Sequence, residues 1–247
     1  MSSTQVLITR PEPDATLLAG EVEKHGLQPI ASPAMAFKPR AAGLDFDCFW
    51  QPGLRKLAVF CSPRAVTLGL RQLPAGFLEG AELAAIGPAS ADQLEAAGLV
   101  ADILPDRPYN SESMLAHRAI SANPGQALLL TAPGGRQRLR EGLQDLGWKV
   151  TFAFVYETVL LPPGPVVERR VQDSDDIISI WTSARALSHM AASMAPDAWK
   201  KVSSGILIVN SDRLARQARA QCSGEVVVAA GPGNDAIMAA LLELSGD

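Results

Sequence analysis

Hydroxyl side chains follow apolar runs at a constant spacing along this chain. Ser62 follows the run LAVFC and Ser183 follows IISIWT, and these two serines are 183 − 62 = 121 residues apart. Ser90 and Ser211 follow later apolar runs and are also 211 − 90 = 121 residues apart. A hydroxyl at a helix start accepts one backbone N–H, and the other unpaired N–H groups there attract anions. The spacing therefore predicts an internal duplication, with anion-binding helix starts in two similar lobes and a cleft between the lobes.

The elements that position these hydroxyls are apolar runs alternating with amphipathic stretches, the pattern of parallel strands joined by crossover helices. Ligands of such sheets bind beyond the carboxyl ends of the strands. Each hydroxyl there, taken singly, is explained by helix capping, whereas the repetition favours a shared function. The expected strands are 6–9, 57–61, 83–86, 100–104, 127–131, 177–181, 206–209 and 225–229, and the hydroxyls at their ends are Thr9, Ser62, Ser90, Thr131, Ser183 and Ser211.

Local signals also predict where helices begin and end. Pro63 suits the first helical position after Ser62, and Ser90 with Gln93 has the spacing of a capping box. Further N-caps are expected from the small polar residues Asp14, Asn110, Ser183 and Asn234, and helix ends are expected at Gly26, Gly98 and Gly147.

Two extended, proline-containing segments depart from this alternation. They cover 27–39 and 148–165 and follow the paired glycines Gly26 and Gly147. We interpret them as strands that cross between the lobes, at about 33–39 and 156–163. One lobe would then combine 1–36 with 162–247, and the other would span 39–158. A simple division near residue 122 is the alternative that the pattern leaves open.

Composition excludes several classes of function. The 247 residues carry a net charge of −4 and contain no basic run, which argues against nucleic-acid binding. No apolar stretch is long enough to span a membrane, and the N-terminus lacks the layout of a secretory signal. The three scattered cysteines indicate reduced thiols and a cytoplasmic location.

Familiar catalytic and cofactor motifs are missing from the sequence. The Gly-rich stretches 131–136 and 231–234 lack the GxGxxG spacing of a dinucleotide site, and GPAS at 87–90 is not the GxSxG of a serine hydrolase. No metal site is expected, because three histidines fall in separate predicted helices without HExxH spacing, namely His25, His117 and His189.

Six blocks in this order resemble the uroporphyrinogen-III synthase family over nearly the whole chain: VLITRPEPDATLLAGEVEKHGLQPIASP, FCSPRAV, AAIGPASADQLEAAG, LLLTAPGGRQRLREGLQDLGWKV, FVYETV and IWTSARAL. The resemblance implies an α/β fold of two similar lobes, each a parallel sheet flanked by helices, joined by a two-stranded β ladder. It also implies a cytoplasmic monomer without metal or organic cofactor. The implied reaction, in tetrapyrrole and heme biosynthesis, closes the linear tetrapyrrole hydroxymethylbilane to uroporphyrinogen III, with loss of water and inversion of the last ring. Transient contact with the preceding pathway enzyme is a further implication.

The resemblance also carries residues over by position. Tyr156 in VYET matches the tyrosine suspected of assisting departure of the substrate hydroxyl, although an aromatic residue packing between strands is the simpler explanation. Ser62, Ser183 and Ser211 match hydroxyl positions that face the substrate. Ser90 stands where the family commonly has threonine.

The remaining matches lie in two loops. Thr131 and Gly134 belong to TAPGGR, which departs from the commoner family pattern at Ala132 and Pro133, so its backbone N–H groups are the expected contacts. Arg10, in the TRP block, is either a carboxylate contact or a brace for its loop. A two-lobed module that binds small anions without catalysis would share all of these features and is the alternative function.

Overall fold

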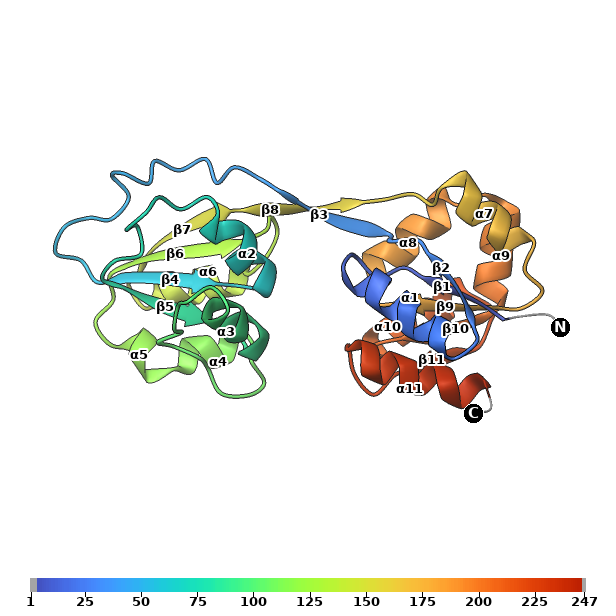
Figure 1. Cartoon of the computed structure of the whole chain (residues 1–247). Helices are drawn as coiled ribbons and strands as arrows, with labels where there is room; N and C mark the ends of the chain where they lie inside the picture. Colours follow the sequence, from blue (N-terminus) through green and yellow to red (C-terminus); the bar gives the residue numbers. More distant parts are fainter. Residues whose placement is uncertain (1–3, 246–247) are drawn as a thin grey trace. The chain divides into compact units, whose positions relative to one another are not determined.

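The computed structural model describes residues 4–245, which form two compact units (Figure 1). Unit 1 contains the chain up to Phe37 together with the chain from Val159 onward, and unit 2 is Lys38–Thr158. Residues 1–3 and 246–247, which the sequence places at the ends of the first lobe, lie outside the described residues. Both units have a parallel sheet with helices on its two faces, as the sequence predicts.

Unit 1 is built on a five-stranded parallel sheet in the order β11-β10-β9-β1-β2. The strands are β1 (Gln5–Ile8), β2 (Gln28–Ala31), β9 (Ile177–Trp181), β10 (Ile206–Val209) and β11 (Val226–Val228). Helices α1 (Asp14–Lys24) and α11 (Asn234–Ser245) pack on one face. The other face is covered by α7 (Pro165–Gln172), α8 (Ala184–Ser193), α9 (Pro196–Ser204) and α10 (Asp212–Gln221).

Unit 2 is built on a four-stranded parallel sheet in the order β5-β4-β6-β7. The strands are β4 (Lys56–Phe60), β5 (Ala81–Ala85), β6 (Gln126–Thr131) and β7 (Lys149–Phe154). Helices α2 (Pro63–Leu70) and α3 (Pro88–Glu95) cover one face, and α4 (Ser111–Ala116), α5 (Arg118–Ser121) and α6 (Gln137–Asp145) cover the other. Alternate residues of β4 enter the two cores, with Leu57 and Val59 on one side and Ala58 and Phe60 on the other.

The two extended segments predicted from the sequence each contain two strands. In each segment the first strand, β2 or β7, joins the parallel sheet of its own unit. The second strands, β3 (Met35–Pro39) and β8 (Tyr156–Leu160), pair with each other in a separate two-stranded sheet. The chain passes from one unit to the other within these two strands.

Seven of the eight expected strands are present, and the prediction of a strand at 100–104 is wrong. Only Ile103 pairs with the sheet, in a single bridge to Ala84. The Asp102 carboxylate accepts the Leu83 N–H at 2.8 Å, and so takes the place of a strand carbonyl. This side-chain bond ends the ladder after one residue.

Most predicted helix boundaries are confirmed. Pro63 opens α2 after the N-cap Ser62, Asn110 caps α4 with a capping box, and Ser183 caps α8. The residue Asp14 is not a cap, because α1 already begins there and the preceding Pro13 takes the N-cap position. Asn234 is the first residue of α11. Helices α1, α3 and α6 end before glycines with positive φ, at Gly26, Gly98 and Gly147.

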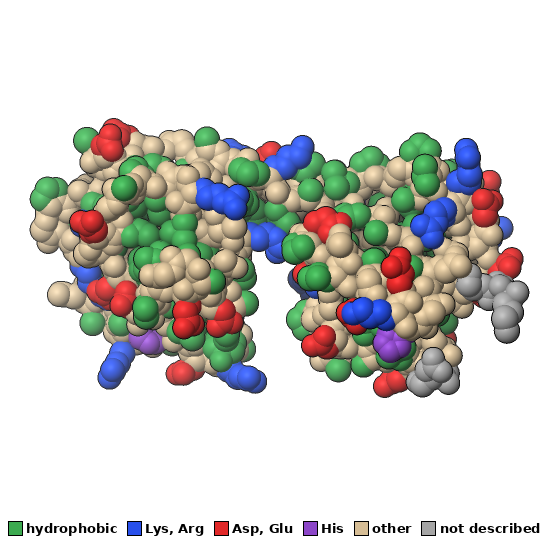
Figure 2. All heavy atoms as spheres, viewed as in Figure 1, with side chains coloured by type: hydrophobic (Ala, Val, Ile, Leu, Met, Phe, Trp, Pro, Cys, Tyr) green, Lys and Arg blue, Asp and Glu red, His purple; other side chains and the backbone are tan. Residues whose placement is uncertain are grey.

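Acidic and basic side chains are interspersed over the face of each unit seen in Figure 2, and the basic ones do not merge into a continuous surface there. Among the helices of the described residues, none combines the length and apolar character needed to cross a bilayer.

Candidate functional site

Ser62 and Tyr156 meet at the carboxyl edge of the unit 2 sheet. Ser62 lies two residues beyond β4, and Tyr156 lies two residues beyond β7. The Ser62 Oγ accepts the Ala65 N–H at 3.1 Å and caps α2. The same Oγ lies 3.1 Å from the Tyr156 Oη. The structure therefore joins the candidate catalytic phenol to a helix start through one serine hydroxyl.

The backbone before Tyr156 is held on both sides by hydrogen bonds of Val155. The Val155 N–H donates to the Thr131 carbonyl at 3.0 Å. The Val155 carbonyl accepts the Arg40 N–H at 3.1 Å and the Gln72 Nε2 at 2.9 Å. Because Val155 is also buried, these bonds fix the position from which the phenol extends.

Thr131 and Gly134 belong to the loop that follows β6. Thr131 is buried at the end of the strand, and Gly134 has φ +78°, a left-handed conformation that favours glycine. Arg136, also left-handed, precedes α6 and donates to the Cys61 carbonyl at 3.4 Å. Burial raises the pKa of the Cys61 thiol to about 12, so this neighbour of Ser62 stays a neutral thiol.

Ser90 is not a helix cap, and its predicted capping box is wrong. Helix α3 begins at Pro88, two residues earlier, with Gly87 as its N-cap. Proline fixes the φ angle that a first helical residue needs, which explains the earlier start. Ser90 instead lies buried inside the first turn, and its N–H donates to the Gly87 carbonyl at 3.0 Å.

Tyr109 is a residue of this edge that the sequence reasoning missed. A Cβ added to Gly87 would lie 3.4 Å from the Tyr109 Cβ, so the tyrosine packs against the cap of α3. Tyr109 has φ +56°, and Arg107 stacks 5.9 Å from its ring centroid. The available signal was its rarity, because the chain contains only two tyrosines.

Ser183 and Ser211 come together at the carboxyl edge of the unit 1 sheet. Each caps its helix, with the Ser183 Oγ 3.3 Å from the Ala186 N and the Ser211 Oγ 3.4 Å from the Leu214 N. Both line one cavity of about 490 Å³, and the charged residues in its lining are Arg185 and Arg213. Two helix starts and two guanidinium groups make this cavity suitable for an anion.

Arg10 is tied to neighbouring loops of unit 1. Its Nη1 donates to the Pro232 carbonyl at 2.7 Å, and its Nη2 lies 2.9 Å from the Asp14 carboxylate. Only 10% of the side chain is exposed. The two loops that it joins follow β1 and β11, so Arg10 braces the same edge of the sheet that carries Ser183.

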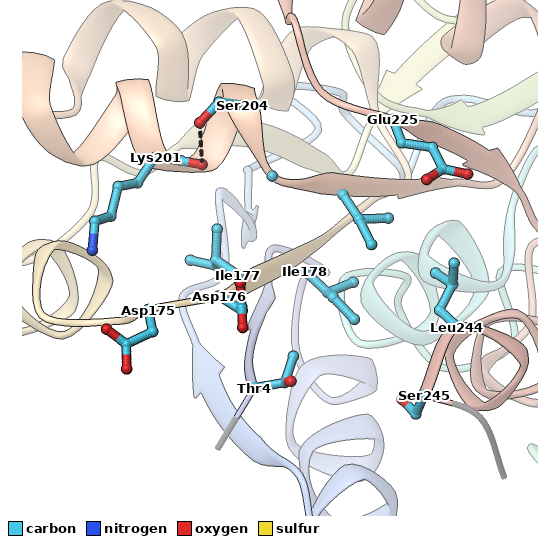
Figure 3. A pocket seen from close by; sticks show the side chains of 12 residues that line it. Thr4, Asp175, Asp176, Ile177, Ile178, Lys201, Ser204, Glu225, Leu244 and Ser245 are labelled. Carbon is cyan, nitrogen blue, oxygen red and sulfur yellow. Dashed lines mark hydrogen bonds between the residues drawn. The ribbon is translucent and has the colours of Figure 1, made fainter. Parts of the chain in front are cut away.

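A different cavity of about 580 Å³ lies at the opposite edge of this sheet (Figure 3). Asp175, Asp176 and Glu225 contribute carboxylates to its lining, and Lys201 contributes a cationic side chain. Helix α9 ends here, with the Ser204 hydroxyl bonded to the Lys201 carbonyl in Figure 3. A helix C-terminus and three carboxylates are unfavourable for a polyanionic ligand. We therefore place the candidate anion-binding residues of unit 1 at the carboxyl edge of its sheet.

Comparison with known proteins identifies the family of this α/β chain. Residues 17–239 match the family model described as "Uroporphyrinogen-III synthase HemD". The chain belongs to the uroporphyrinogen-III synthase family. Among the described residues of this family member, no group of three or more His, Cys, Asp and Glu side chains is arranged to hold a metal ion.

Two solved structures share the fold of this uroporphyrinogen-III synthase family member. A mutant uroporphyrinogen III synthase from Thermus thermophilus is 17% identical with a TM-score of 0.62, and the match covers 99% of this chain and 100% of that one. A uroporphyrinogen-III synthetase from Helicobacter pylori is 15% identical with a TM-score of 0.62, covering 98% of this chain and 99% of that one.

Proposed function

We propose that this chain, as a uroporphyrinogen-III synthase, closes hydroxymethylbilane to uroporphyrinogen III with Tyr156 as the proton donor. The product retains all four pyrrole rings, with the last one inverted, and one water is released. The observation that carries the role of Tyr156 is its 3.1 Å contact with Ser62 beside the start of α2. A phenol in this position can donate a proton and then share the resulting charge with a hydrogen-bond donor.

The proton balance of the reaction requires only one such group. Tyr156 gives its proton to the substrate hydroxyl, which leaves as water, and the remaining pyrrole methylene becomes an azafulvene-type cation. The carbon of the last ring that already bears the bridge to the third ring attacks this cation, and the old bridge bond then breaks, which leaves a second azafulvene-type cation on the third ring. The free α-carbon of the last ring attacks this second cation, so the ring is inverted. The proton that this carbon loses as the pyrrole recovers its aromaticity returns to the phenolate. General-acid help of this kind accelerates reactions by about 10²–10⁴-fold. Holding the reacting carbons in place contributes roughly 7–11 kcal/mol.

The substrate carries eight carboxylates, and helix starts are the proposed means of holding them. In unit 1 the carboxylates would bind at Ser183 and Ser211, with Arg185 and Arg213 as added cations. In unit 2 they would bind backbone N–H groups near Ser90, Thr131 and Gly134. Each carboxylate at a helix start is worth about 0.3–1 kcal/mol, so several weak contacts would orient the chain of rings.

Arg10 is better assigned as a loop brace than as a carboxylate contact. Its two Nη atoms already bind Pro232 and Asp14, and little of the side chain is exposed. We further propose that the enzyme works as a cytoplasmic monomer without metal or organic cofactor. Its three free thiols support a reducing compartment.

The test is incubation with hydroxymethylbilane, followed by separation of the type I and type III uroporphyrinogens. Wild type should give type III, and Tyr156→Phe should retain the circular dichroism spectrum while turnover falls tenfold or more. Glu225→Gln, in the cavity at the opposite edge, is the control and should match wild type. Formation of type I alone would contradict the activity and favour an anion-binding module, whereas unchanged turnover of Tyr156→Phe would remove Tyr156 from the mechanism.

A further inference from the structure

The Ser62 hydroxyl makes two hydrogen bonds that link Tyr156 to the main chain of α2. Its Oγ accepts the Ala65 N–H at 3.1 Å and is 3.1 Å from the Tyr156 Oη. The peptide N–H has no proton-accepting role, so the direction of the first bond is fixed. In the second bond either the Ser62 Oγ or the Tyr156 Oη can be the donor while the phenol keeps its proton.

The direction of the second bond becomes fixed when Tyr156 loses its proton. A phenolate oxygen only accepts, so Ser62 must then be the donor. The Ser62 Oγ is at the same time polarised by the Ala65 N–H and by the positive end of α2, which makes its proton a better donor. The interaction is thus stronger in the charged state than in the ground state, which is the condition for accelerating a chemical step.

We propose that Ser62 is a positioning residue for Tyr156, which orients the phenol and donates a hydrogen bond to its oxygen as the proton leaves. This inference rests on the proposed function, in which Tyr156 is the acid. It replaces the direct substrate contact expected of Ser62 from the sequence. It predicts that Ser62 matters to catalysis only while residue 156 carries a hydroxyl.

The internal duplication supports a dedicated role for this pair. Ser183 caps α8 in unit 1 as Ser62 caps α2 in unit 2, 121 residues earlier. The same offset relates Tyr156, the first residue of β8, to Met35, the first residue of β3, because 156 − 35 = 121. Met35 is buried in the core of unit 1. The cap is therefore present in both units, whereas the phenol beside it is present in only one.

A double-mutant cycle tests the proposal with Ser62→Gly, Tyr156→Phe and the combined variant. Glycine at an N-cap costs a helix little stability, so it removes the hydroxyl with little damage to α2. Ser62→Gly alone should lower kcat about tenfold and leave KM within twofold. In the Tyr156→Phe background the same change should lower kcat by less than twofold, because the group through which Ser62 acts is gone. Ser62→Thr, which retains a hydroxyl, should recover kcat to within about threefold of wild type.

A structural role for Ser62 gives a different result. The Ser62→Gly loss would then appear in full in the Tyr156→Phe background, and that outcome overturns the proposal. Ser183→Gly is the matched control, because it removes the duplicated cap in unit 1, where position 35 carries methionine in place of a phenol, and its effect should be the same in both backgrounds. The wild-type assay separates the two levels of inference. If wild type forms no type III product, both the proposed function and the role of Ser62 fail, whereas additive losses in an active enzyme refute only the role of Ser62.

Discussion

Replacing Arg10 with methionine should destabilise unit 1 and leave catalysis intact. Methionine retains the apolar stem of the side chain and removes the guanidinium that joins the loops after β1 and β11. The substitution eliminates the 2.7 Å hydrogen bond to the Pro232 carbonyl and the 2.9 Å ion pair with Asp14. The prediction decides between the two roles that the sequence left open for this residue.

The expected loss of stability in Arg10→Met follows from how deeply each lost interaction is buried. A hydrogen bond from a charged group is worth about 1.5–3 kcal/mol, and this one is nearly buried. The Asp14 side chain is 37% exposed, so its ion pair contributes only about 0.2–1 kcal/mol. The Arg10 Nε is buried without a partner among the described residues, and its removal recovers part of the loss. The net destabilisation should be about 2–3 kcal/mol, or roughly 6–15 °C in the Tm of unit 1.

Thermal unfolding with hydrogen exchange measures the effect and locates it. The Tm should fall, and protection should decrease in β1 and at the start of α11 but remain at wild-type levels in β4 and β6. At a temperature well below unfolding, kcat and KM for hydroxymethylbilane should stay within twofold of wild type. An unchanged Tm with a KM raised tenfold would refute the reasoning and identify Arg10 as a carboxylate contact.

Two substitutions and one chemical modification test the structure of unit 2. Arg55 holds the pKa of Glu82 below its usual value, so the stability from this pair is present above about pH 4.3 and is lost as the pH falls through the lower, folded-state pKa. Glu82→Gln should therefore lower the free energy of unfolding by about 0.5–1 kcal/mol at pH 7 and leave it unchanged in more acidic solution. Urea unfolding at the two pH values measures this difference. Gly125→Ala would place a Cβ 2.2 Å from the Arg55 carbonyl oxygen, so it should destabilise by about 1–3 kcal/mol in the same assay. A thiol reagent should modify exposed Cys48 quickly and reach buried Cys61, whose thiol pKa is raised to about 12, only after unfolding.

Apolar runs predicted seven strands of the two parallel sheets but not the edge strands β2 and β7, and local capping signals predicted most helix starts. The central strands β4, β6 and β9 are apolar runs buried on both faces, and the caps at Ser62 and Ser183 depend on residues adjacent in sequence. The failures arose from competing local chemistry. Pro88 moved the start of α3 ahead of Ser90, and the Asp102 carboxylate ended a strand that the residues 100–104 otherwise favour.

The contact between Ser62 and Tyr156 was beyond the reach of sequence patterns. The two residues are 94 positions apart and come from different strands, and their distance depends on how β8 leaves the sheet after Val155. In the structure both residues lie at the same edge of a sheet, because β4 and β7 are parallel. Tyr156 was selected through the family resemblance, whereas the spacing of hydroxyls placed only Ser62 at that edge. The spacing gave no position for Tyr156 relative to Ser62. It contained no information on whether their oxygens would be 3 Å or 10 Å apart.

The divergence of the two copies favours main-chain N–H groups over hydroxyls as the contacts that we propose at the helix starts. Ser211 caps α10, whereas the helix in the corresponding place, α3, is capped by Gly87, and 211 − 87 = 124 rather than 121. The second crossover therefore has a helix start in both copies, whereas only one copy has a hydroxyl cap. If the hydroxyls themselves bound the carboxylates, the copy without this cap would lack a contact, whereas its backbone N–H groups remain. The hydroxyl of Ser62 is the exception, because a phenolate beside it needs a donor that glycine does not supply.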